Sequence, residues 1–240
     1  MLKPYQQIPI QECHEPLVPI PLAEFSVESP PPYLKLGADY GNASPYFLRA
    51  TVLQQLQQAQ KNLQAQRPQW QLHLFDAYRP LAVQQFMVDY TYQDLLQRQS
   101  QPESELTEGD RAEILKQVQT FWAVPSADPA TPPPHSTGGA IDLTLVDETG
   151  QPLPMGGEID EIQPYSYPNY YAQAQPNKPE YQYHQNRELL NQVMAQAGFL
   201  RHPNEWWHFS SGDQGWCWLQ QQAGGGCAAA RYGRYEDVLV

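Results

Sequence analysis

The sequence predicts a single α+β domain in which a small antiparallel sheet is surrounded by helices. Three observations support this prediction: helix-like spacing of apolar residues in several segments, two short apolar strands far apart in the chain, and a proline-rich beginning without periodicity. A chain of 240 residues fits one domain better than two and can bury a substantial core. We therefore divide it into an N-terminal arm (1–46) packed on the body, a main domain (47–218) and a C-terminal tail (219–240).

The first half of the main domain is predicted to contain a helix, a strand and a second helix. Apolar residues recur at helical spacing between glutamines, and Pro68 ends the pattern. The residues that share this spacing are Leu48, Val52, Leu56, Ala59 and Leu63. Alternation over 70–75 predicts a strand, and the turn 76–80 (DAYRP) leads into a helix that begins near Leu81.

The middle of the chain is predicted to contain a third helix and a buried strand. Thr107 and Asp110 have the spacing of a capping box for a helix that ends near Trp122. The loop 124–134 (VPSADPATPPP) is rich in proline and stiffens the approach to the next strand. Residues 140–146 (AIDLTLV) are continuously apolar apart from Asp142 and Thr144, which predicts a buried strand.

The last third is predicted to contain a loop, a fourth helix and a final strand. The segment 164–179 is rich in tyrosine and proline, which fits either a functional lid or an ordinary surface excursion. A helix is expected over 186–197 with Gly198 as its C-terminal cap, followed by a strand at 205–209 (EWWHF). Small residues after Trp218 predict a loose tail.

Charge and cysteine content exclude several classes of function. The chain has 14 basic and 26 acidic side chains, a net charge of −12 that disfavours nucleic acid and anionic membranes as partners. Cys13, Cys217 and Cys227 lack paired zinc-site spacing and suggest a reducing compartment. Pro4 and Pro9 lie where a signal peptide needs an apolar run, so we expect a cytoplasmic protein.

Residues around two histidines have the pattern of a catalytic metal site. His135 ends the stiff loop, two glycines follow it, and Asp142 is on the face of the predicted strand opposite Ile141. A nitrogen and an oxygen ligand form half of a zinc site, and His208 is the candidate third ligand. Glu205, three residues before it, is placed to accept a proton from a zinc-bound water.

The same residues also fit a purely structural role or a different metal. Asp142 fits an inward polar residue satisfied by the glycine-rich turn, and His208 fits a partly buried ring beside Trp206 and Trp207. Two histidines and one carboxylate also ligate iron(II) in oxygenases, but their carboxylate usually follows the first histidine closely, and Glu205 has no role there. From these residues alone, the structural, iron and zinc interpretations remain open.

Four motifs together resemble the zinc D-alanyl-D-alanine dipeptidases of the vancomycin-resistance type. They occur in the order and spacing of that family, which shares its fold with zinc D-Ala-D-Ala carboxypeptidases and the Hedgehog signalling domain. The motifs are 75–80 (FDAYRP), 135–145 (HSTGGAIDLTL), 155–160 (MGGEID) and 205–209 (EWWHF). The match covers most of the chain and implies a Hedgehog/DD-peptidase fold whose small sheet carries a zinc site.

The resemblance implies a role for each residue that matches these motifs. His135, Asp142 and His208 hold one Zn²⁺ per chain, and Glu205 is the catalytic base. Two further residues follow from the resemblance: Arg79 as the oxyanion-stabilising arginine and Asp160 as the carboxylate for the free amino group of a small peptide substrate. From the residues alone, the alternative role for Arg79 is a salt bridge to Asp76.

The chain departs from the family in two places. Pro133 and Pro134 stand where dipeptidases of this family carry serines, so two hydroxyls are missing from the pocket rim. The early tyrosine segment of the family is poorly matched by 37–45, where Tyr40 is the candidate. Two alternatives therefore stay open beside the dipeptidase: a zinc carboxypeptidase acting on peptidoglycan peptides, and a zinc-stabilised binding module without activity.

Overall fold

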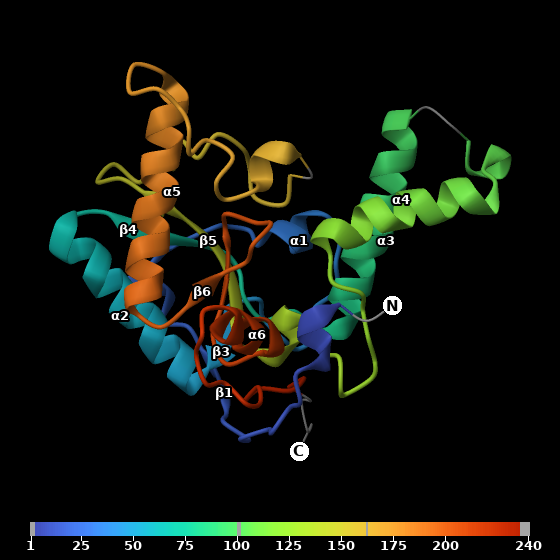
Figure 1. The fold of residues 1–240 in the computed structure, drawn as a ribbon, viewed down its shortest axis with the longest axis horizontal. Helices are drawn as coiled ribbons and strands as arrows, with labels where there is room; N and C mark the ends of the chain where they lie inside the picture. Colours follow the sequence, from blue (N-terminus) through green and yellow to red (C-terminus); the bar gives the residue numbers. More distant parts are fainter. Residues whose placement is uncertain (1–2, 100–101, 162, 236–240) are drawn as a thin grey trace.

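A central sheet with helices packed against it organises the structure, a computed structural model that describes residues 3–99, 102–161 and 163–235 (Figure 1). The α-helices are α1 (Pro32–Lys35), α2 (Ala50–Gln66), α3 (Leu81–Gln99), α4 (Glu108–Phe121), α5 (Pro179–Gln196) and α6 (Gln214–Gln222). The strands are β1 (Leu17–Pro19), β2 (Ser26–Val27), β3 (Phe47–Arg49), β4 (Gln71–Asp76), β5 (Ala140–Val146), β6 (Leu200–Arg201) and β7 (His208–Ser210). The short 3-10 helices are η1 (Pro4–Gln7), η2 (Leu22–Glu24), η3 (Glu103–Glu105), η4 (Pro134–Thr137) and η5 (Pro164–Ser166).

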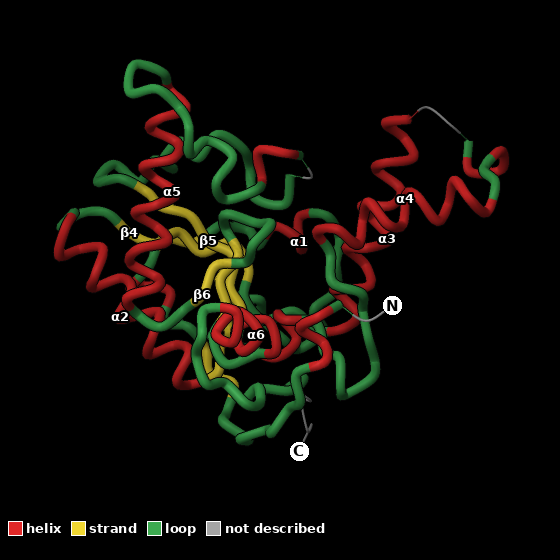
Figure 2. Tube along the Cα trace, viewed as in Figure 1, coloured by secondary structure: helices red, strands yellow, loops and turns green. Residues whose placement is uncertain are grey.

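The main sheet has five strands in the order β2-β4-β5-β7-β6. Strands β4, β5 and β6 of this sheet are labelled in Figure 2. All neighbours are antiparallel except β2 and β4, which are parallel. The predicted α+β fold is confirmed, with one difference: the N-terminal arm adds β2 to the edge of the sheet. A second, two-stranded sheet pairs β1 of the arm with β3. The arm is therefore part of both sheets and protects their edges.

The sheet separates an apolar core from a polar face. Side chains from α2, α5 and the alternating positions of three strands form one buried cluster. Its main members are Val52, Leu56, Leu63, Leu72, Leu74, Ile141, Leu143, Leu145, Leu190, Val193 and Phe209. Because side chains alternate along a strand, Asp142 projects to the opposite face from Ile141 and Leu143. The pattern that builds the core thus directs a carboxylate away from it.

The helices agree with the sequence, with two shifted boundaries. The capping box of α4 is confirmed, because Thr107 Oγ1 accepts from Asp110 N (3.2 Å) and Asp110 Oδ2 accepts from Thr107 N (2.9 Å). Residues 47–49 form β3 instead of the first turn of α2, since they pair with the arm. Helix α5 begins at Pro179 rather than near residue 186. The apolar spacing does not reveal this earlier start, because the first turns of the helix carry no apolar stripe. Among the described helices, none is both long and apolar enough to cross a membrane.

The C-terminal region is more ordered than the sequence predicts. Helix α6 crosses the predicted boundary at residue 218, and Tyr232 beyond it is only 1% exposed. The prediction of a loose tail is therefore wrong for the described part, while 236–240 lie outside the described residues. Cys217 and Cys227 form a disulfide. The cysteine argument for a reducing compartment loses its basis, because disulfides are rare there, and the cytoplasmic location stays a prediction.

Candidate active site

Two of the predicted metal ligands come from neighbouring strands of the sheet. Asp142 of β5 is directly opposite His208 of β7 in the antiparallel register, and the two side chains share the polar face. Both are buried, with exposed fractions of 2% for Asp142 and 6% for His208. His208 Nδ1 lies 2.9 Å from Asp142 Oδ1. The pairing register, which the apolar core fixes, therefore brings the two side chains together.

The third predicted ligand, His135, comes from η4, the 3-10 turn that leads into β5. Gly138 has φ +72°, a left-handed conformation that lets the chain turn back toward the sheet. The ring of His135 is oriented by its Nδ1, which donates to the carbonyl of Ala77 (2.6 Å). Since a carbonyl only accepts, the proton is on Nδ1, and Nε2 faces Asp142 and His208 with a lone pair.

The three donor atoms are arranged as a metal site requires. His135 Nε2 lies 3.1 Å from His208 Nδ1 and 3.2 Å from Asp142 Oδ2. Ligand atoms about 2.0–2.1 Å from a tetrahedral zinc ion are separated by slightly more than these distances. Three electron-rich atoms this close repel one another unless a proton or a cation lies between them. This donor set, two imidazoles and a carboxylate, suits zinc and leaves a fourth position open.

The two histidines also determine how Asp142 titrates. Burial raises the pKa of Asp142, but its electrostatic interactions and hydrogen bonds with His135 and His208 outweigh burial and bring the pKa well below its usual range. Asp142 is therefore ionised near neutral pH, which is the form that ligates a cation.

Glu205 lies beside His208 and completes the centre. Its Oε2 is 3.8 Å from His208 Nδ1, and its Oε1 is 3.5 Å from Nδ1 of His202. Burial raises the pKa of Glu205 to about 8; Asp142 adds to this, whereas His208 opposes it. His202, in the turn before β7, packs its ring against His208, with centroids 5.4 Å apart.

Arg79 combines the two roles that the sequence left as alternatives. Its Nε and Nη2 donate to Asp76 Oδ2 at 3.0 and 2.8 Å, so the salt bridge is present. Nη2 also reaches Asp142 Oδ2 at 3.3 Å, and Nη1 donates to Gln84 Oε1 at 3.0 Å. The guanidinium thus lies at the metal site while its orientation is fixed by Asp76.

Asp160 lines the same cavity as Arg79 and is hydrogen-bonded to Tyr33, a residue that the sequence analysis did not predict at the site. Its Oδ2 accepts from the hydroxyl of Tyr33 (2.8 Å), which in turn accepts from Arg79 Nη2 (2.9 Å). Burial and the nearby Asp142 raise the pKa of Asp160 to about 7. Tyr40 donates instead to Asp76 (2.8 Å), so Tyr33, and not Tyr40, is the tyrosine at Asp160. Tyr33 and Asp160 are 127 residues apart, and no local pattern marks their contact.

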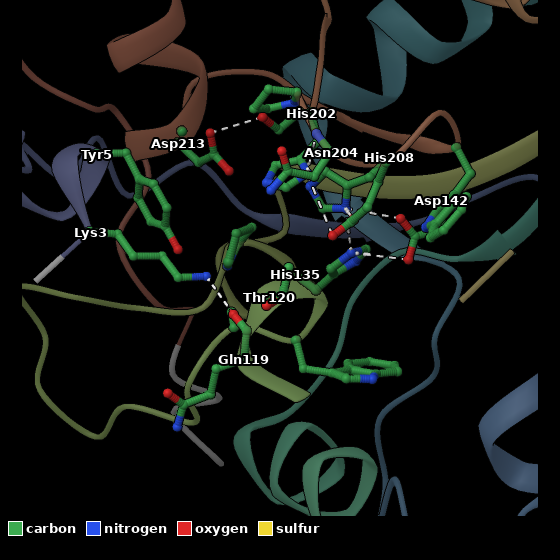
Figure 3. Close-up of a pocket in the computed structure, with 18 of the residues that line it drawn as sticks. Lys3, Tyr5, Gln119, Thr120, His135, Asp142, His202, Asn204, His208 and Asp213 are labelled. Carbon is green, nitrogen blue, oxygen red and sulfur yellow. Dashed lines mark hydrogen bonds and ion pairs between the residues drawn. The ribbon is translucent and has the colours of Figure 1, made fainter. Parts of the chain in front are cut away.

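These side chains surround a cavity of about 690 Å³, part of which is shown in Figure 3. All six predicted site residues line it: Arg79, His135, Asp142, Asp160, Glu205 and His208. Trp207 also lines it, whereas the buried Trp206 packs edge-to-face against Trp207 and contacts Arg187. The described residues of the loop 164–179 do not line this cavity; Arg187 holds the loop through the carbonyls of Tyr165 (2.8 Å) and Tyr167 (3.1 Å).

Comparison with known proteins gives consistent matches. The family model described as D-ala-D-ala dipeptidase (Peptidase_M15) matches residues 27–224. The D-alanyl-D-alanine dipeptidase of Synechocystis is 53% identical over 226 residues, which cover 92% of each chain. That of Enterococcus faecium is 32% identical over 151 residues, covering 60% of this chain and 63% of that protein. Among solved structures, the vancomycin-resistance D,D-pentapeptidase VanY in complex with Zn(II) matches with a TM-score of 0.44 and 17% identity over 86% of this chain and 87% of that one.

Proposed function

Because this chain belongs to the D-Ala-D-Ala dipeptidase family of metallopeptidases, we propose that it hydrolyses D-alanyl-D-alanine to two molecules of D-alanine with one zinc ion per chain. The observation that carries the proposal is the convergence of His135, Asp142 and His208, in which the closest ligand atoms of each pair are 2.9–3.2 Å apart and Glu205 lies beside them. These three residues would hold the zinc ion. A catalytic zinc ion would lower the pKa of a bound water and polarise the carbonyl oxygen of the substrate.

Glu205 is the proposed general base and acid. Its carboxylate is 3.8 Å from His208 Nδ1, so it lies beside the residues that would hold the zinc ion. There it takes a proton from the attacking water and later gives that proton to the leaving amine. Glu205 is only 7% exposed, and this low exposure to solvent strengthens its electrostatic interactions.

Arg79 is the proposed donor to the oxyanion. Its guanidinium is 3% exposed and lies over the rings of Tyr33 (4.7 Å) and Trp122 (5.0 Å). Asp76 holds one edge of the guanidinium, so the orientation of the N–H donors of Arg79 is fixed before substrate binds. Such preorganised donors stabilise developing negative charge because they need no reorientation during the reaction.

Asp160 is the proposed partner of the free amino group of the substrate. The hydrogen bond from Tyr33 engages Oδ2, and Oδ1 would accept from the amino group. A buried carboxylate binds an ammonium group more strongly than a neutral amide, which favours a free dipeptide over the end of a longer peptide. This is the property that separates a dipeptidase from the carboxypeptidase alternative.

Turnover of a small peptide panel by the zinc-loaded protein tests the proposal. D-Ala-D-Ala should release D-alanine, whereas L-Ala-L-Ala and N-acetyl-D-Ala-D-Ala should be much poorer substrates. Preference for the N-acetylated peptide would support the carboxypeptidase alternative instead. Bound zinc without turnover of any of the three would contradict the proposed dipeptide hydrolysis.

A further inference from the structure

The cavity has a second wall that the metal ligands do not form. Lys3, Pro4 and Tyr5 of the N-terminal arm line this wall together with Gln119 and Thr120 of α4. In Figure 3, Lys3 and Tyr5 extend into the cavity from one side, while the histidines and Asp142 lie across from them. A segment far from the zinc motifs in sequence therefore faces the reaction centre.

Lys3 is the cation at this wall that is available to a ligand. Three cationic side chains line the cavity: Lys3, Arg79 and Lys116. Arg79 is held by Asp76 and Asp142, and Lys116 pairs with Glu113 through a side chain that is 76% exposed. In the described part of the chain, the Lys3 ammonium donates to the carbonyl of Gln119 (3.0 Å) and forms no ion pair. An ammonium has three N–H donors, so two remain for an anion.

Several acidic side chains disfavour an anionic group in much of the cavity. Asp160, Glu205 and Asp213 line it together with the metal ligand Asp142. Asp213 is 2% exposed, and its Oδ2 has no hydrogen-bond partner in the described structure. Pro134, directly before His135, offers no side-chain donor. A carboxylate can therefore lie here only where a cation offsets these acids.

The charges in the cavity are divided between two ends. Asp160 is joined through the hydroxyl of Tyr33 to Arg79, which lies beside Asp142 on the sheet side. Lys3 extends into the cavity from the arm, across from the histidines (Figure 3). An extended dipeptide separates its amino and carboxyl groups by about 7 Å at most. Its two charges can therefore face different sides of the cavity.

We propose that Lys3 binds the C-terminal carboxylate of the dipeptide, while Asp160 binds its amino group. This assignment rests on the proposed function and adds a specificity-determining residue to it. The arm would thereby complete the substrate site, and the enzyme would recognise both ends of a zwitterion. A peptide lengthened at either end would lose one of the two contacts.

The arm is held firmly enough to position Lys3. The backbone N–H of Lys3 donates to Gln6 Oε1 (2.8 Å) at the start of η1. The buried Gln214 of α6 donates through Nε2 to the carbonyls of Ile8 (2.7 Å) and Ala130 (2.9 Å). Gln214 thus fastens the arm beside the loop before His135. A preplaced ammonium loses little entropy when the ligand binds.

The test compares Lys3→Met with Lys3→Arg on D-Ala-D-Ala and on its C-terminal amide. Lys3→Met should raise KM for the free acid by about 10- to 100-fold with little change in kcat, since one charge-assisted contact is lost. KM for the amide should not change, because the amide carries no carboxylate. Lys3→Arg should restore most of the affinity. Lys61→Met, on the exposed face of α2, is the matched control and should behave as wild type.

The outcomes separate this assignment from the proposed function. Zinc content and thermal unfolding should match wild type in both Lys3 variants, which shows that the fold and the metal site are intact. Equal KM values of wild type and Lys3→Met for the free acid, with wild type active, would overturn the role of Lys3 alone. The same would follow from an equal rise in KM for acid and amide. Wild type that turns over no dipeptide would overturn the proposed function and this assignment with it.

Discussion

The two ends of the cavity are built in different ways. At the Asp160 end, Tyr33 joins the carboxylate to Arg79, and Arg79 is joined to Asp76, so one buried network connects the site with the sheet. At the Lys3 end, a single hydrogen bond to a backbone carbonyl holds the side chain. Substitutions at the first end should therefore affect catalysis and stability together. Substitutions at the second end should affect substrate binding alone.

The largest expected effect lies between the two ends, at Glu205. Glu205→Gln keeps the shape of the side chain but cannot accept the proton of the attacking water. We expect kcat to fall by about 10²- to 10⁴-fold, the usual contribution of a general base. Zinc content should not change, because Glu205 is not one of the three ligands. A variant that loses zinc yet keeps its activity would contradict this division of roles.

Arg79→Lys tests the buried network. A lysine keeps the charge but lacks the planar fork that contacts Asp76 twice and reaches Asp142. We expect kcat to fall by about 100-fold or more. The melting temperature should fall as well, because a buried carboxylate loses part of its pairing. Arg67→Lys, at an exposed position after α2, is the control and should change neither quantity.

Asp160→Asn sharpens the contrast with Lys3. The amide keeps the size of the side chain but removes the charge that we propose binds the amino group. We expect KM for D-Ala-D-Ala to rise by about 10- to 100-fold, while the poor turnover of the N-acetylated dipeptide stays the same. Steady-state kinetics on both substrates provide the measurement. An equal loss of activity on both substrates would show that Asp160 does not bind the amino group.

The smallest expected effect comes from a matched pair of tyrosines. Tyr33→Phe removes the hydroxyl between Asp160 and Arg79, and Tyr40→Phe removes a hydroxyl that donates to Asp76. Removing a supporting hydrogen bond should raise KM about 10-fold in Tyr33→Phe. Tyr40→Phe should leave KM near wild type, because its hydroxyl does not contact Asp160. A larger rise in KM from Tyr40→Phe would reverse the assignment of the two tyrosines.

The contrast between the two ends also shows how far the sequence predicts the site. His135, Asp142 and His208 lie in or next to buried strands, where alternation and register determine which residues meet. The apolar pattern of β5 is therefore sufficient to predict the face on which Asp142 lies. Family motifs supplied Arg79 and Asp160, and both line the cavity.

The arm and the tail could not be predicted in the same way. Tyr33 and Lys3 lie in a proline-rich segment without periodicity, and their contacts are far away in sequence. The disulfide joins Cys217 in α6 to Cys227 in the segment after that helix. Zinc-site patterns of cysteine spacing do not predict this pairing. Long-range contacts of irregular chain leave no local signal, so their place follows only from the folded structure.

Zinc titration of the metal-free protein tests the central claim most directly. D-alanine release from D-Ala-D-Ala should be absent without metal, rise linearly with added zinc and level off at one equivalent per chain. His135→Ala, treated in the same way, should bind zinc weakly and release no D-alanine. Release of D-alanine by the metal-free protein, or a protein that binds one zinc ion and releases none, would contradict the claim.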